Sequence, residues 1–207
     1  MAQTLTRSPA WGELVLPAIA MALIVLASNI LVRYPFTPFG LGDYLTWGAF
    51  TYPFAFLVTD ITNRRFGAAG ARHVVYVGFA AAVILSAVFA TPRVAIASGL
   101  AFLLAQLLDV AIFDRLRRLA WWVPPFASSV VSSAVDTAVF FTLAFGCASV
   151  IGAGFALVGI HEACGEGLPW QTWALFDYLV KLGLAALFIL PYGAALRLFA
   201  QPMPRRA

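Results

Sequence analysis

Charged side chains are scarce in this chain of 207 residues. Asp, Glu, Lys and Arg make up 11% of it and hydrophobic residues 62%, whereas soluble domains average about 25% charged residues. This scarcity excludes an ordinary soluble globular domain. The mean hydropathy of +0.91 also excludes a disordered or collagen-like chain, because both are polar and rich in Gly and Pro. The remaining class is an integral membrane protein.

Histidine and cysteine are also scarce, with two of each: His73, His161, Cys147 and Cys164. Hydrolytic metal sites need clustered ligands, and the run from His161 to Cys164 lacks the second His of a zinc-hydrolase motif. No GxxxxGK[ST] loop is present to bind nucleotide phosphates, and no Gly-x-Gly-Asp run of an intramembrane aspartyl protease lies inside a hydrophobic run. We therefore expect a protein that is not an enzyme and that needs no metal or cofactor.

Long hydrophobic runs are abundant, and six of them suit membrane helices. A helix needs about 20 mostly apolar residues to cross the hydrocarbon core. The stretch 146–171 contains a Gly-rich apolar run that is too short to cross, so we expect an external loop that is interfacial or re-entrant. The sequence predicts one all-α membrane domain over residues 1–207, with spans at 14–32, 47–63, 73–90, 94–113, 126–145 and 173–199.

The basic residues are distributed unevenly over this map. Arg33 and Arg93 fall on one side, and Lys181 lies inside the sixth span. Short cytoplasmic loops collect positive charge, so both termini are predicted to be cytoplasmic, and no nucleic-acid partner is needed to explain the net charge. Cys147 and Cys164 then lie outside, where a disulfide is possible, although we expect two free thiols. The side with ten basic residues carries Arg7, Arg64, Arg65, Arg72, Arg115, Arg117, Arg118, Arg197, Arg205 and Arg206.

Four acids lie inside the predicted spans, where each costs about 2.5–3.5 kcal/mol if ionised near the helix centre. Asp60 and Asp109 are near the cytoplasmic end, where interfacial ion pairs with neighbouring arginines are the alternative to a binding role. Asp136 lies near mid-membrane. Asp177 and Lys181 share one helix face, so they can neutralise one another or hold a ligand between them. A polar cavity and a structural internal pair both remain open for these three residues.

Neutral polar and aromatic residues extend the pattern on neighbouring helices. Carboxylates and amides together suit a flat, nitrogen-rich heterocycle, on which aromatic rings can stack. The third span lacks charges and amides, so we expect its Ala/Val surface to face lipid or a second copy in a homodimer. The candidate binding residues are Asn29, Trp47, Phe50, Phe54, Asp60, Asn63, Gln106, Asp109, Asp136, Asp177 and Lys181.

The stretch 46–67, TWGAFTYPFAFLVTDITNRRFG, resembles the signature of the bacterial queuosine-precursor transporters, also called the vitamin uptake transporter family. The chief departure from the family pattern is the Gly-rich stretch 146–171. Further similarities follow in order along nearly the whole chain: Ser28-Asn29, 106–110, Arg115 to Arg117, Asp136-Thr137, Asp177-Tyr178, Lys181 and Pro191.

The resemblance implies uptake, across the bacterial inner membrane, of 7-cyano-7-deazaguanine and 7-aminomethyl-7-deazaguanine for queuosine salvage. It also implies a fold similar to the six-helix substrate-binding subunits of energy-coupling-factor transporters, but without a partner ATPase. The alternative is a binding subunit for another vitamin or nucleobase that depends on a separate ATPase module.

Overall fold

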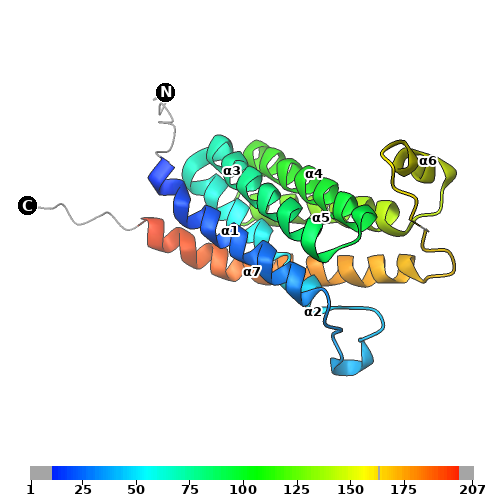
Figure 1. Cartoon of the computed structure of the whole chain (residues 1–207). Coiled ribbons are helices and arrows are strands. Elements are labelled where there is room, and N and C mark those ends of the chain that lie inside the picture. Colours follow the sequence, from blue (N-terminus) through cyan, green and yellow to red (C-terminus); the bar gives the residue numbers. More distant parts are fainter. Residues whose placement is uncertain (1–10, 163, 201–207) are drawn as a thin grey trace, which may run out of the picture.

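The computed structural model describes residues 11–162 and 164–200, so Arg7, Arg205 and Arg206 of the predicted basic side lie outside the described residues. The described ranges form a helical bundle without a strand (Figure 1). A short 3-10 helix, Pro38–Gly40, lies between the first two α-helices. The α-helices are α1 (Trp11–Leu31), α2 (Trp47–Thr51), α3 (Phe54–Phe89), α4 (Pro92–Leu116), α5 (Val123–Phe145), α6 (Ser149–Leu157) and α7 (Trp170–Ala200).

Five segments are long and apolar enough to cross a membrane, which confirms the α-helical membrane class. Four of them each correspond to one predicted span. The predicted second and third spans, 47–63 and 73–90, fall together in the remaining segment, Trp47–Ser86. The five segments are Trp11–Leu31, Trp47–Ser86, Pro92–Leu116, Val123–Phe145 and Trp170–Leu198.

The segment Trp47–Ser86 reverses direction at Gly67. This residue has φ +78° and ψ 174°, a backbone conformation open essentially to glycine alone. Ser28 on α1 donates a hydrogen bond to Thr51, and Ser86 donates one to Asn29. A continuous helix from Thr51 to Ser86 would be about 50 Å long, yet both residues reach the same end of α1. The two halves of α3 are therefore antiparallel, as Figure 1 shows in cyan and teal.

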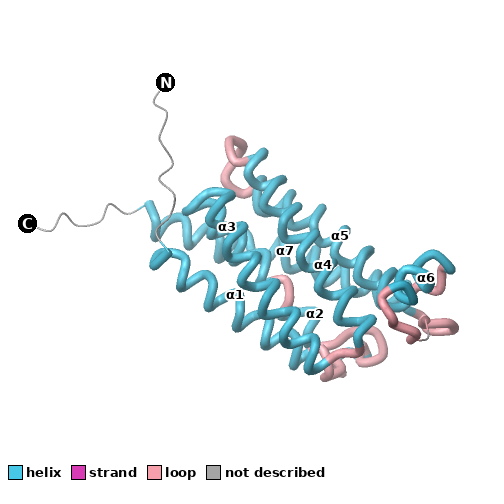
Figure 2. The backbone as a smooth tube through the Cα atoms, turned by 45° about the horizontal axis from the view of Figure 1, so that its top comes forward, coloured by secondary structure: helices cyan, strands magenta, loops and turns pink. Residues whose placement is uncertain are grey.

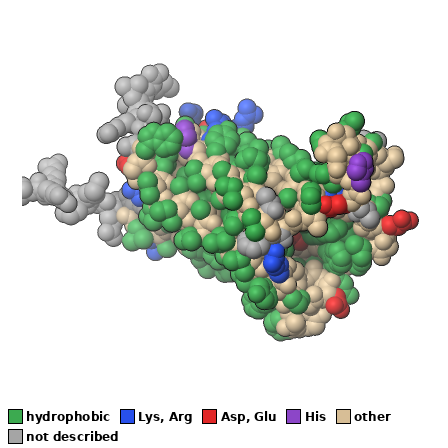
Figure 3. All heavy atoms as spheres, in the orientation of Figure 1, with side chains coloured by type: hydrophobic (Ala, Val, Ile, Leu, Met, Phe, Trp, Pro, Cys, Tyr) green, Lys and Arg blue, Asp and Glu red, His purple; other side chains and the backbone are tan. Residues whose placement is uncertain are grey.

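The helices pack side by side with α4 between α3 and α5, while α1 packs on α3 and α7 on α5. Most loops lie at the two ends of the bundle, and a short break separates α2 from α3 (Figure 2). Close packing depends on small residues, as is usual between membrane helices. At Gly78, for instance, a Cβ atom would lie 2.5 Å from Cγ of Met21. Hydrophobic side chains cover most of the visible middle of the molecule (Figure 3).

The second half of α3 differs from the expectation that its surface faces only lipid or a second copy. Val74, Val75 and Ala82 are buried in the core against α1. Ile84 and Val88 on the opposite face are exposed. Both faces of this half of the helix are apolar, although one packs against α1 and the other is exposed. Composition does not distinguish them, because helix–helix contacts in a membrane are as apolar as the lipid-facing surface.

The stretch 146–171 contains α6, a helix of 9 residues that is too short to span a bilayer. Cys147 and Cys164 form a disulfide across this stretch, so the expectation of two free thiols is wrong. Gly165 donates its backbone N–H to the carbonyl of Phe145 at 2.9 Å, and this contact returns the chain to the end of α5. The predicted external position of both cysteines made a disulfide possible, but the sequence separation of 17 residues did not show that the chain returns to the end of α5.

Candidate functional site

A cavity of about 470 Å³ lies among α1, α2, α3, α4, α5 and α7, and its volume is typical of small-molecule sites. Its wall includes residues 42–46 and the turn between α3 and α4, which places it toward the end of the bundle opposite the start of α1. Much of the wall is aromatic, with Tyr44, Tyr52, Phe102, Phe140, Phe141, Phe145 and Trp173. The predicted site residues that line it are Asn29, Asp136, Asp177 and Lys181.

A closed network of charges forms one side of this cavity. Lys181 is 4% exposed, and its Nζ donates to Oδ2 of Asp136 at 2.7 Å and to Oδ2 of Asp177 at 2.5 Å. The third donation goes to Oγ1 of Thr137 at 3.0 Å, so all three N–H groups of the lysine have partners. The hydroxyl of Thr137 donates in turn to Asp177 at 2.7 Å. The structure therefore combines the two interpretations left open by the sequence, because the internal ion pair is itself part of a cavity wall.

Two carboxylates and one ammonium give this network a formal charge of −1, so it favours a ligand that brings N–H donors or positive charge. Both oxygens of Asp136 are used, by Lys181 and by the hydroxyl of Tyr52 at 2.9 Å. Oδ2 of Asp177 is also used, but the described residues supply no donor to its Oδ1. One turn earlier on α7, the buried indole N–H of Trp173 has no acceptor among them. The cavity wall thus offers one free acceptor, Oδ1 of Asp177, whereas the Trp173 N–H is shielded from the open space of the cavity.

Asn29 lies at the opposite wall, near the end of α1. Its Nδ2 donates to the carbonyl of Val25 at 2.9 Å, and its Oδ1 accepts a hydrogen bond from Ser86 at 3.4 Å. The amide is therefore fixed by α1 and by the second half of α3. Asn29 and Asp177 line the cavity from helices that lie far apart in the sequence. The helical spacing of the polar residues predicted an interior polar site of this kind.

The predicted aromatic residues do not line this cavity. The rings of Trp47 and Phe50 pack against Phe36 in the loop after α1, and Phe54 packs against Phe188 of α7. Tyr52, which sequence reasoning left out of the site, lines the cavity instead. A signal was available, because the buried positions of this segment, Ala55, Phe56, Thr59 and Asn63, follow Tyr52 at helical spacing.

Another set of predicted residues forms a separate polar cluster, nearer the end of the bundle where α1 begins. Oε1 of Gln106 accepts a hydrogen bond from Thr59 at 2.6 Å. Nδ2 of Asn63 donates to the carbonyl of Val110 at 3.1 Å, and Arg117 donates to Oδ1 of Asn63. These side chains connect α3 to α4, and none of them lines the 470 Å³ cavity.

Asp60 and Asp109 belong to the same cluster, and no salt bridge joins either to a basic residue in the described part of the chain. The alternative of ion pairs with nearby arginines is therefore wrong. Arg64 donates to Tyr192 and to the carbonyls of Arg117 and Trp121, because the ends of α4 and of the following turn expose unpaired carbonyl oxygens.

The sequence matches the model of the family described as "Putative vitamin uptake transporter" over residues 46–92 and 85–195. The chain belongs to this family. The matched ranges include all residues of the charged network and all residues of the second polar cluster. The match to the family model does not include the region of this chain before residue 46, which contains α1 and Asn29.

Three relatives are similar to this family member over most of its length. The "Queuosine precursor transporter" of Escherichia coli (strain K12) is 34% identical and covers 85% of this chain and 83% of its own. A "Probable queuosine precursor transporter" of Haemophilus influenzae (strain Rd KW20) is also 34% identical, with 87% and 85% covered. One of the same name from Bacillus subtilis (strain 168) is 29% identical, with 72% and 70% covered. No solved structure matches.

Proposed function

We propose that this chain takes up queuosine precursors of the 7-deazaguanine class, namely 7-cyano-7-deazaguanine and its aminomethyl analogue, and that the 470 Å³ cavity is the site where the base binds. The names of the relatives support the substrate class. The structural observation that carries the proposal is the Asp177 carboxylate in the cavity wall, whose Oδ1 receives no hydrogen bond from the described residues.

This carboxylate is complementary to one edge of the base. The 2-amino-pyrimidinone edge presents adjacent N–H donors, and Asp177 can accept hydrogen bonds from them. A polar group left without a partner inside a protein costs about 1–3 kcal/mol. A ligand that supplies N–H donors to Asp177 gains that free energy, whereas a ligand without this edge leaves the carboxylate oxygen unpaired.

The rest of the wall suits the flat part of the ligand. Phe102, Phe140 and Tyr44 line the same cavity and offer ring faces and edges for packing against a bicyclic ring. Tyr44 is itself stacked on Phe176 of α7, with ring centroids 5.0 Å apart, so it is held in place before ligand arrives. The net charge of −1 in the Lys181 network favours the aminomethyl analogue, which carries an ammonium group.

We further propose six membrane crossings with both termini in the cytoplasm of a bacterial inner membrane. The antiparallel halves of α3 each supply one crossing. Described arginines support the orientation, because the turn at Gly67 and the end of α4 carry six of them and are joined by hydrogen bonds between Arg64 and Arg117. The cavity then opens toward the outside, where an uptake carrier meets its substrate. Labelling of single introduced cysteines with an impermeant reagent tests this orientation.

A binding titration of the purified protein tests the substrate. We expect saturable binding of 7-cyano-7-deazaguanine and 7-aminomethyl-7-deazaguanine and none of a panel of vitamins, with guanine, which shares the 2-amino-pyrimidinone edge, as the comparison ligand. Preferential binding of one vitamin would reject the proposed substrate. Uptake by liposomes that contain only this chain tests the second half of the proposal, that no ATPase module is required. The chain would be a dependent binding subunit if it bound the base in detergent but gave no uptake in liposomes.

A further inference from the structure

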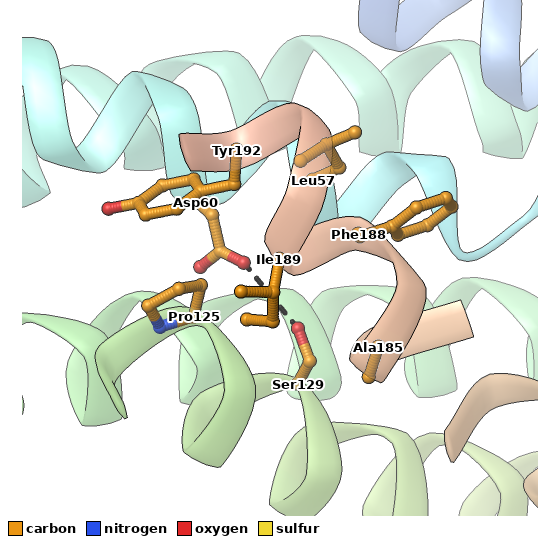
Figure 4. Close-up of a pocket in the computed structure, with 8 residues that line it drawn as sticks. All are labelled: Leu57, Asp60, Pro125, Ser129, Ala185, Phe188, Ile189 and Tyr192. Atoms are coloured by element: carbon orange, nitrogen blue, oxygen red, sulfur yellow. Dashed lines mark hydrogen bonds between the residues drawn. The ribbon is translucent and has the colours of Figure 1, made fainter. Parts of the chain in front are cut away.

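The second polar cluster contains two carboxyl groups that face one another across α3 and α4. Asp60 is 3% exposed and Asp109 is fully buried, and the two groups interact electrostatically. Figure 4 shows Asp60 pointing toward Ser129 between α5 and α7. Because both acids lie in membrane-spanning helices, each would cost about 2.5–3.5 kcal/mol if ionised and unpaired.

The surrounding helices supply no cation to neutralise this pair. On α3, the guanidinium of Arg64 is used by Tyr192 and by backbone carbonyls, and from the end of α4 Arg117 bonds to Asn63 and Asp114. Tyr192 is the ionisable group that α7 presents to Asp60. From α5, only hydroxyl groups reach the pair within the described residues.

Hydrogen-bonding capacity around the pair is unfilled. Ser128 and Ser129 donate to Asp60 at 3.4 and 3.5 Å, distances at which a hydrogen bond is weak. Neither oxygen of Asp109 has a donor, and the buried Oγ of Ser132 also lacks a partner among the described residues. Buried polar atoms are nearly always hydrogen-bonded, so this concentration of unpaired atoms indicates a missing ligand.

The space beside Asp60 limits what that ligand can be. A cavity of about 10 Å³ is lined by Asp60, Ser129 and Tyr192 and otherwise by apolar side chains such as Leu57 and Phe188 (Figure 4). This volume is close to that of one water molecule, so no organic substrate fits. A metal cation would need about six oxygen ligands, and this cavity has three polar side chains. A proton, delivered through one water molecule, needs only an acceptor.

We propose that Asp60 and Asp109 form the proton-binding site that couples uptake of the base to the proton gradient. The inference rests on the proposed transport function and adds its energy source. Proton binding removes one negative charge from the pair and supplies the O–H donor that the second carboxylate lacks. Two neighbouring carboxyl groups in proteins can share one proton, because the repulsion between like charges disfavours ionisation of both.

Helix α5 connects this site to the substrate cavity. Ser128 lies beside Asp60, and Asp136 lies eight residues later on the same helix, about 12 Å away along its axis. Asp136 belongs to the Lys181 network in the cavity wall. A shift of α5 when the carboxyl pair gains or loses its proton therefore moves the substrate-binding network as well.

The test uses the full chain in liposomes under an imposed pH gradient, without Na⁺, with the variants Asp60→Asn and Asp109→Asn. We expect the gradient to increase the initial rate of uptake at least fivefold in the unmodified chain. Each variant should lose at least 90% of this increase while its equilibrium affinity for the base and its exchange of internal for external base stay within about threefold. The control is Asp114→Asn, at an exposed carboxylate at the end of α4, which should behave like the unmodified chain.

A second measurement does not depend on the substrate. Infrared difference spectra between acid and alkaline buffer should contain a C=O band of a protonated carboxylic acid that disappears in the double variant. An unchanged band in the double variant overturns the proposal, and so does accumulation driven by a Na⁺ gradient alone. Loss of base binding in both variants also overturns it, since the pair would then belong to the substrate site. If the unmodified chain binds no deazaguanine but the band behaves as expected, the proposed substrate fails and the proton site stands.

Discussion

The hydroxyl of Tyr52 donates a 2.9 Å hydrogen bond to Oδ1 of Asp136, which lies 84 residues later in the sequence. Tyr52 occupies the break between α2 and α3, where the chain leaves one helix and enters the next. This contact fixes the break against α5 and leaves the second oxygen of Asp136 for Lys181. The position of the break therefore determines the geometry of the charged network in the cavity.

Replacement of the tyrosine should weaken substrate binding. Tyr52→Phe removes a hydrogen bond to a charged acceptor, a contribution of about 1.5–3 kcal/mol, and leaves Oδ1 of Asp136 unpaired. We expect the affinity for 7-cyano-7-deazaguanine to fall roughly tenfold in a binding titration. Tyr178→Phe is the matched control, because the hydroxyl of Tyr178 makes a long 3.4 Å contact to a backbone carbonyl outside the cavity lining. An equal loss in both variants would contradict the assigned role of Tyr52.

Removal of the lysine should destabilise the bundle more than removal of the whole ion pair. Lys181→Met leaves two buried carboxylates facing each other, and breaking a buried pair in this way costs about 3–5 kcal/mol. Thermal unfolding in detergent should show a large drop in the midpoint temperature. The double variant Lys181→Met with Asp136→Asn should recover part of the loss, because one uncompensated charge is then absent. A double variant less stable than Lys181→Met would show that the network is not organised by charge.

Much of the site could be predicted because charge inside a membrane span is rare and has few structural explanations. Asp136, Asp177 and Lys181 were identified on this ground, and the spacing of four residues correctly placed the last two on one helix face. The sequence also separated Asp60 and Asp109, near the cytoplasmic end, from Asp136, near mid-membrane, but it did not show that the first two form a cluster outside the 470 Å³ cavity. Tyr52 was not among the predicted site residues although helical spacing favoured it, and its hydrogen bond to Asp136 depends on a helix break that the aromatic pattern does not reveal.

The fold shows the same limit at Gly67. Hydropathy identified the two spans on either side of this residue, and both lie within one segment of 40 residues, Trp47–Ser86. The antiparallel arrangement depends on one φ angle of +78°. The sequence contains 16 glycines, and nothing local distinguishes the one that reverses the chain from those that fill tight helix contacts.

Substitution of Gly67 should therefore be costly where substitution of another helical glycine is not. Gly67→Ala places a Cβ on a backbone conformation that other residues rarely adopt, at a cost of about 1–3 kcal/mol, although space is free around it. We expect a lower yield of folded protein and a lower midpoint of thermal unfolding. Gly183→Ala on α7 is the control, because nothing lies within 4 Å of the added atom and the backbone is helical. It should be neutral or stabilising by up to about 1 kcal/mol.

Reduction of the disulfide should loosen the external loop without affecting substrate binding. Cys147 and Cys164 close a loop of 17 residues, for which chain entropy predicts a stabilisation of about 3 kcal/mol. A shift in gel mobility on reduction should report the bond, and partial proteolysis should cut the 146–171 stretch faster after reduction. Cys147→Ser should give the same proteolysis pattern without reductant. Identical proteolysis of the oxidised and reduced protein would show that the bond does not constrain this loop.

The free oxygen of Asp177 should determine which edge of the base is recognised. Asp177→Asn replaces an acceptor pair with one acceptor and one N–H donor group, which opposes the N–H donors of the 2-amino-pyrimidinone edge. We expect at least tenfold weaker binding of 7-cyano-7-deazaguanine, measured by titration in detergent. An analogue without the 2-amino group should already bind weakly to the unmodified chain, and the substitution should change its affinity less than threefold.

The two losses are not independent because they remove the same hydrogen bond, so a double-mutant-type cycle of protein variant and analogue should give a coupling of at least about 1 kcal/mol. Additive losses would place the 2-amino group elsewhere in the cavity. Another polar group of the wall would then be its acceptor, and Oδ1 of Asn29 is the first to test.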